Sequence, residues 1–111
     1  MNRVNALAMP AMLLLLSLAT NLQAALKVFA CEPEWASLVS ELAGDQAQVY
    51  TATTAQQDVH YIQARPSLIA QVRRADLVIC TGAELEVGWL PVLLRRAGNR
   101  RVLPGTDGYL E

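Results

Sequence analysis

Acidic side chains and the only histidine of the chain occur where apolar segments give way to polar ones. They form three pairs, in chain order Glu32 and Glu34, Asp58 and His60, and Glu84 and Glu86. Imidazole and carboxylate groups are ligand types that suit zinc and its first-row neighbours. A metal site is therefore one hypothesis, provided that the fold brings the pairs to the same edge.

Each pair also has a simpler interpretation. A lone histidine in a loop is usually solvated, and its spacing alone gives only weak support for a metal role. Glu32 and Glu34, like Glu84 and Glu86, would be favourable charges at the start of a helix. The residue types alone leave both interpretations open.

Several enzyme signatures are absent from the sequence. It contains no glycine-rich phosphate loop, no G-x-S-x-G elbow and no H-E-x-x-H zinc-protease motif. Cys31 or Cys80 could form a thiolate pair with His60, so a small exported thiol or redox enzyme is the alternative function. Both cysteines lie in apolar segments, however, where buried inert thiols are more common.

The elements that must position these residues alternate between strands and helices. Apolar, β-capable stretches predict strands over 26–31, 48–53, 75–81 and 101–103. Helices are predicted from Pro33 to the stop at Gly44, from Pro66 to about Arg74, and from about Glu86 to Ala97, before Gly98 and Asn99. The turn-rich residues after Leu103 predict no further element.

Within the first helix, one apolar stripe is expected to be buried. Its residues recur at three-to-four spacing and are Trp35, Leu38, Val39 and Leu42. The second helix is expected to turn Leu68, Ile69 and Val72 inward. Such strand–helix alternation favours an α/β fold, a parallel sheet with right-handed crossovers and helices on both faces. Ligands of open sheets of this type bind at the carboxyl ends of the strands, where the three pairs lie.

Residues 1–24 have the layout of a secretory signal. Arg3 gives a positive start, an apolar run follows, and Ala24 is a small residue at the expected cleavage point. The run is shorter than the roughly 20 residues that span a bilayer. Cleavage would leave residues 25–111 as a periplasmic domain. An uncleaved membrane anchor and a lipoprotein acylated at Cys31 are the alternatives. The formal charge of −1 gives no reason to expect a nucleic-acid partner.

The two cysteines could be bridged. A β-α-β-α-β unit often places its first strand between the second and third, so Cys31 and Cys80 would lie on neighbouring strands about 4.8 Å apart. An oxidising compartment would permit the bond. Because the register is not known from sequence, packed free thiols are the favoured expectation.

Three stretches carry a family resemblance. Asp58-Val59-His60 followed by Arg65-Pro66-Ser67 resembles the Asp-Pro-His…Pro-Ser signature of metal-binding ABC-transporter solute-binding proteins. Residues 75–90 look like that family's next strand and helix start, and residues 35–45 look like its first helix and turn. The family's proline is replaced here by Val59, which implies a less rigid loop.

The resemblance implies two α/β lobes joined by a long helix, with zinc or manganese in the cleft between them. His60 corresponds to the first of typically three histidine ligands, and Asp58, Glu84 and Glu86 are candidates for lining the cleft or supporting the ligand. The implied role is capture of the metal outside the cytoplasmic membrane and delivery to a membrane permease, with no reaction catalysed. The linking helix, the second lobe and the remaining ligands are expected beyond Glu111, so residues 25–111 would be a truncated N-terminal lobe.

Overall fold

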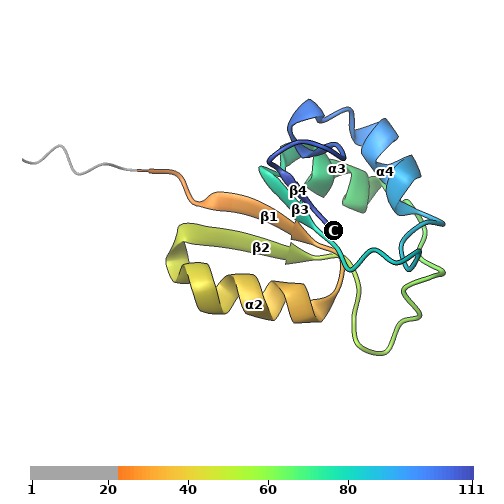
Figure 1. The fold of residues 1–111 in the computed structure, drawn as a ribbon, viewed down its shortest axis with the longest axis horizontal. Helices are drawn as coiled ribbons and strands as arrows, with labels where there is room; N and C mark the ends of the chain where they lie inside the picture. The colour runs from red at the N-terminus through yellow and green to blue at the C-terminus, as the bar shows by residue number, and fades with distance from the viewer. Residues whose placement is uncertain (1–22) are drawn as a thin grey trace, which may run out of the picture.

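Four parallel strands form the centre of the protein in the computed structural model, which describes residues 23–111 (Figure 1). They are β1 (Leu26–Ala30), β2 (Ala47–Thr51), β3 (Leu77–Ile79) and β4 (Tyr109–Leu110). The sheet order is β2-β1-β3-β4, and each neighbouring pair is parallel. The predicted position of the first strand between the second and third is confirmed.

Helices cover both faces of this sheet, as predicted (Figure 1). Side chains alternate between the two faces along a strand. On one face Val28 and Ala30 pack against α2 (Pro33–Ala43). On the other, Phe29 belongs to the larger core built with α3 (Pro66–Arg74) and α4 (Leu90–Ala97). The α/β fold class with a parallel sheet is therefore confirmed.

Only two of the four residues predicted to form a buried stripe on α2 are packed against the sheet. Trp35 and Val39 pack against the sheet, whereas Leu38 is 45% exposed and Leu42 is 77% exposed. The reason is that β2 is the outer strand, so no further strand lies beneath the outer side of the helix. The helix ends where predicted, at Gly44, whose positive φ of 53° suits glycine. A short 3₁₀ turn, η1 (Gly44–Gln46), leads into β2.

The helix predicted from about Glu86 begins only at Leu90. Residues 82–89 are turns, and Ala83 and Glu84 have positive φ angles of 53° and 67°, which exclude regular helix. Pro91 suits the first turn of the helix that follows. The predicted stop is confirmed, because Gly98 adopts the left-handed conformation.

The strand predicted over 101–103 is wrong. Arg101 and Val102 belong to the 3₁₀ helix η2 (Arg100–Val102), which Leu103 follows, because the Asn99 side chain accepts a hydrogen bond from the Arg101 backbone and caps the turn. Asn99 also donates to the carbonyls of Val72 and Ala75, which fixes the turn against α3. The fourth strand is instead β4, within the segment for which no element was predicted. It follows Gly108, where any side chain would collide with the Arg101 carbonyl.

Among the helices formed by residues 23–111, none is long and apolar enough to cross a membrane. Most of the predicted signal, residues 1–22, lies outside the described part of the chain. Ala24, the expected cleavage residue, is exposed and precedes β1.

Candidate metal centre

His60 belongs to the long loop between β2 and α3. Figure 1 shows that this loop extends beyond the carboxyl ends of β1 and β2. Its side chain is 53% exposed, and its Nδ1 atom lies 2.7 Å from Oδ1 of Asp58. The same oxygen accepts the backbone N–H of His60 at 3.0 Å. An ionised carboxylate only accepts hydrogen bonds, so the proton of this contact is on Nδ1. In the neutral ring, Nε2 is then the nitrogen with a free lone pair.

This arrangement is the one that metal-binding histidines commonly use. Such a ring usually gives its second N–H to a carboxylate, which fixes the tautomer and the ring orientation. Two hydrogen bonds hold the pKa of Asp58 below its usual range: the larger effect comes from the His60 backbone N–H and the smaller from the His60 ring. Asp58 therefore stays ionised and continues to accept the Nδ1 proton, which leaves Nε2 available as a ligand.

The backbone of the His60 loop is anchored at Val59, the residue that replaces the family's proline. Its carbonyl accepts a 2.7 Å hydrogen bond from Nε1 of Trp89, a side chain only 1% exposed. The Val59 side chain also packs against the larger core. A tryptophan in the turn before α4 thus restrains the histidine loop, and no sequence signal pointed to this role.

A second group of side chains gathers where β1 and β3 end. Cys31 and Cys80 form a disulfide there, with Cα atoms 4.8 Å apart, so the expectation of free thiols is wrong. The parallel register pairs Ala30 with Ile79, which brings the next residue of each strand together. The Cys31 backbone N–H donates to the Ile79 carbonyl at 2.9 Å and maintains that alignment.

Two buried carboxyl groups adjoin this disulfide. Glu86 is 3% exposed and accepts the backbone N–H groups of Thr81 at 2.8 Å and Gly82 at 3.0 Å. Glu32 is 7% exposed; its Oε2 accepts from the Thr81 hydroxyl at 3.1 Å. Burial is the main cause that raises the pKa of Glu32 to about 8, and the neighbouring Glu86 carboxyl group raises it further. Glu32 therefore keeps its proton at neutral pH.

The three predicted pairs do not form a single cluster. Asp58 and His60 lie together, and Glu86 lies with Glu32 beside the disulfide. Glu34 is exposed in the first turn of α2, which matches its helix-start interpretation. Glu84 is exposed on a turn of positive φ and lines a surface cavity with Glu86. Within residues 23–111, no hydrogen bond or ion pair joins His60 to Glu84 or Glu86.

Three solved structures described here have the same fold as this chain. A periplasmic metal binding protein from Candidatus Liberibacter asiaticus matches with a TM-score of 0.57 and 18% identity, over 80% of this chain and 29% of that one. The crystal structure of ZnuA matches with a TM-score of 0.63 and 20% identity, over 76% and 33% of the two chains. Zn(II)-bound AdcA from Streptococcus pneumoniae has a TM-score of 0.55 and 20% identity, over 80% and 18%.

The family is shown by a sequence model that matches residues 28–110. The model is described as "ZnuA: Zinc-uptake complex component A periplasmic". The chain belongs to this family. No curated protein sequence matches the chain significantly. The chain spans about a third or less of the length of the solved structures described above. Its relation to the family therefore concerns one α/β lobe.

Proposed function

We propose that this chain is the N-terminal lobe of an extracytoplasmic substrate-binding component of an ABC transporter. In this role it captures a transition metal ion, most readily zinc, and delivers it to a membrane permease without catalysing a reaction. The contact between His60 Nδ1 and Asp58 Oδ1 carries the proposal, because it presents Nε2 as a ready ligand. Membership of a family described as periplasmic zinc-uptake components supports the same role.

This function requires export, which we assign to a secretory signal at residues 1–24. Cleavage after Ala24 would leave residues 25–111 as the periplasmic product. The exposure of Ala24 ahead of β1 is compatible with access by a signal peptidase. Mass spectrometry of the exported protein tests the assignment. A product that begins at Ala25 is expected, whereas retention of Met1 in a membrane fraction or an acylated Cys31 would contradict it.

The choice of zinc over manganese rests on the family description and on the imidazole ligand. Structures of the Candidatus Liberibacter asiaticus protein are described as Mn-bound and Cd-bound, so the fold alone does not select one metal. Imidazole suits zinc well, whereas manganese favours oxygen ligands. Among the residues of this chain, only His60 supplies an imidazole.

The alternative of an exported thiol enzyme gains no support. Cys31 is 0% exposed and Cys80 is 2% exposed, and the two form a disulfide. A catalytic thiolate has to be partly exposed in an electropositive setting. Here the disulfide lies beside the carboxyl group of Glu86, which opposes formation of a thiolate that is not bound to a metal.

The test uses the fact that the chain has a single histidine. Zinc is added to the oxidised protein while the imidazole ring signals are followed by NMR. The proposal predicts that they shift or broaden in proportion to zinc, whereas magnesium has no such effect. His60→Ala should abolish the zinc-dependent signals from neighbouring loop residues, and Gln56→Ala, at an exposed position of the same loop, should retain them. An imidazole that does not respond to zinc would contradict the proposal.

A further inference from the structure

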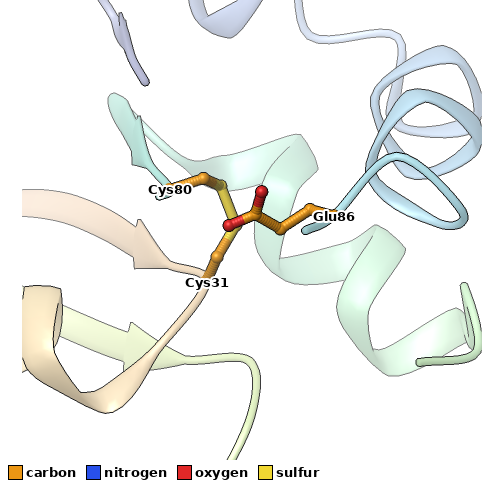
Figure 2. A group of neighbouring side chains, drawn as sticks. All are labelled: Cys31, Cys80 and Glu86. Carbon is orange, nitrogen blue, oxygen red and sulfur yellow. A yellow bond between two sulfur atoms is a disulfide. The ribbon is translucent and has the colours of Figure 1, made fainter. Parts of the chain in front are cut away.

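The group at the ends of β1 and β3 contains potential metal ligands that the His60 site does not use. The Cys31 and Cys80 sulfurs and a carboxylate oxygen of Glu86 all lie within 4.8 Å of one another. Figure 2 shows that Glu86 reaches the disulfide from the turn before α4, with its carboxyl group beside the two sulfurs. Two parts of the chain, 49 residues apart at the two cysteines, therefore place sulfur and oxygen donors around one point.

Glu32 adds an independent indication of a ligand. Its side chain is 93% buried, and its Oε1 atom has no hydrogen-bond partner. Buried carboxyl oxygens in native proteins are nearly always paired, so an unpaired one requires an explanation. The Glu32 carboxyl group lies close enough to Glu86 to interact with its charge, which places the group beside the cluster.

The cluster also lacks a compensating positive charge. Within residues 23–111, the ion pairs are His60 with Asp58 and Arg101 with Asp76, and neither involves Glu32 or Glu86. Buried carboxylates are normally paired with cations or coordinate metals. A divalent cation would supply the missing charge and would also give Glu32 Oε1 a partner.

We propose that reduction of the Cys31–Cys80 disulfide turns this group into a binding site for a thiophilic divalent metal ion such as zinc or cadmium. The ligands are the two cysteine thiolates and Glu86, with Glu32 completing the set. The disulfide is reduced by an external dithiol, which becomes a disulfide as Cys31 and Cys80 each gain a proton. Metal binding then releases the protons of both thiols to solvent.

The geometry allows this change with local movement. Zinc–sulfur bonds are about 2.3 Å, so the sulfurs of a tetrahedral site lie roughly 3.7 Å apart, beyond bonding distance. Rotation of the cysteine side chains can supply that separation while the strand backbones stay paired. Of the proposed ligands, Glu86 also lines a surface cavity of about 430 Å³. Two thiolates with carboxylates select zinc or cadmium over manganese.

This site shares no residue with the proposed His60 centre and does not depend on it. It functions only in the reduced state, whereas the Asp58–His60 pair is unaffected by disulfide chemistry. The metal affinity of the second site is therefore controlled by redox state. In an oxidising compartment the disulfide closes the site, and an exported dithiol donor opens it.

Cobalt(II) is a suitable probe because thiolate ligation produces an intense near-ultraviolet charge-transfer band that nitrogen and oxygen ligands do not. The full chain is titrated with cobalt before and after reduction with a water-soluble phosphine, which becomes a phosphine oxide. The band is expected only in the reduced protein, and added zinc should abolish it. Reduced protein that gives no band, whether folded or unfolded, would overturn the proposal.

Substitutions identify the ligands. Cys31→Ser and Cys80→Ser should each remove the band. Glu86→Gln should weaken cobalt binding about 100- to 1,000-fold, the share of one ligand in a four-ligand site. The exposed Glu84→Gln is its matched control and should bind normally. Because Glu86 also holds two backbone N–H groups, Glu32→Gln provides a second test that spares those bonds, and it should also weaken binding.

His60→Ala distinguishes the two metal sites. The proposal predicts that the cobalt–thiolate band of the reduced protein is unchanged in this variant, even if zinc no longer binds to the oxidised protein. Loss of the band in His60→Ala would contradict a separate site. Binding that survives both cysteine substitutions would likewise show that the sulfurs are not ligands.

Discussion

At the scale of single residues, the value of His60 as a ligand depends on Asp58. The aspartate fixes the ring through Nδ1 and the loop backbone through the His60 N–H. Both bonds use the same carboxylate oxygen, so one side chain determines both the tautomer and the ring orientation. Asn at position 58 could accept both bonds through its amide oxygen but would supply no negative charge.

We therefore expect Asp58→Asn to weaken zinc binding at His60 about 10- to 100-fold, the usual effect of removing the carboxylate behind a metal-binding histidine. Zinc titration followed through the His60 ring signals measures this change. Gln56→Ala, at an exposed position of the same loop, is the matched control. Equal zinc affinity in Asp58→Asn and the parent would exclude a supporting role for Asp58.

Glu32 should make stability depend on pH. Its pKa in the folded protein is about 8, against 4.5 for the unperturbed group, so the folded chain binds more protons between these values. The stabilisation is fully present below about pH 4.5 and is lost as pH rises through about 8. Urea unfolding of the oxidised, metal-free chain should show this decline in unfolding free energy.

Glu32→Gln should make that profile flatter, because the amide does not titrate, while the exposed Glu34→Gln should leave it unchanged. The relevant neighbours are Glu86, whose charge reinforces the shift, and the Thr81 hydroxyl, which opposes it. An unchanged slope in Glu32→Gln would show that the proton is held elsewhere.

At the scale of secondary structure, the predictable elements were those with strong local signals. Pro66 marks the first turn of α3 and Gly44 ends α2, so these boundaries could be predicted. Strand β4 has two residues and exists because Tyr109 and Leu110 pair with β3, a contact that no local pattern encodes. The apolar residue Val102 likewise suggested a strand, but its buried side chain fills the core from a 3₁₀ turn.

The disulfide joins two elements separated by 49 residues in sequence. A cross-link that closes a loop of this length restricts the unfolded chain and is expected to contribute about 4 kcal/mol. A Cys31→Ala/Cys80→Ala variant should lose about that amount of unfolding free energy, as measured in urea. Phosphine should destabilise the parent but not this variant. A double variant as stable as the oxidised parent would show that the bridge contributes little.

At the scale of the whole molecule, the candidate site could be predicted only in part. The Asp58–His60 pair was accessible from sequence because its residues are two positions apart. The group of Glu32, Glu86 and the disulfide depends on strand order and register, and Trp89 restrains the histidine loop from 30 residues away. Such long-range contacts are set by packing, which a single sequence does not reveal.

The chain covers 29–33% of two of the solved structures it resembles, which bears on how strongly it can hold zinc. A complete structural zinc site is worth roughly 10 to 16 kcal/mol, so one of four ligands accounts for about 3 to 4 kcal/mol. That share corresponds to millimolar binding at best. The oxidised chain, with His60 as its sole imidazole, should therefore bind zinc weakly, while a two-lobed member of the family should bind it tightly.

Calorimetric zinc titration of three samples tests this expectation: the oxidised chain, a two-lobed form that carries the same first lobe, and the His60→Ala variant of that form. The substitution should sharply weaken binding without unfolding the lobe, because His60 is half-exposed and lies outside the core. Gln56→Ala in the two-lobed form is the matched control. Unchanged affinity in His60→Ala would remove this residue from the site. Tight binding by the oxidised single lobe would mean that its own residues form a complete site, because the disulfide keeps both cysteine sulfurs from acting as thiolate ligands.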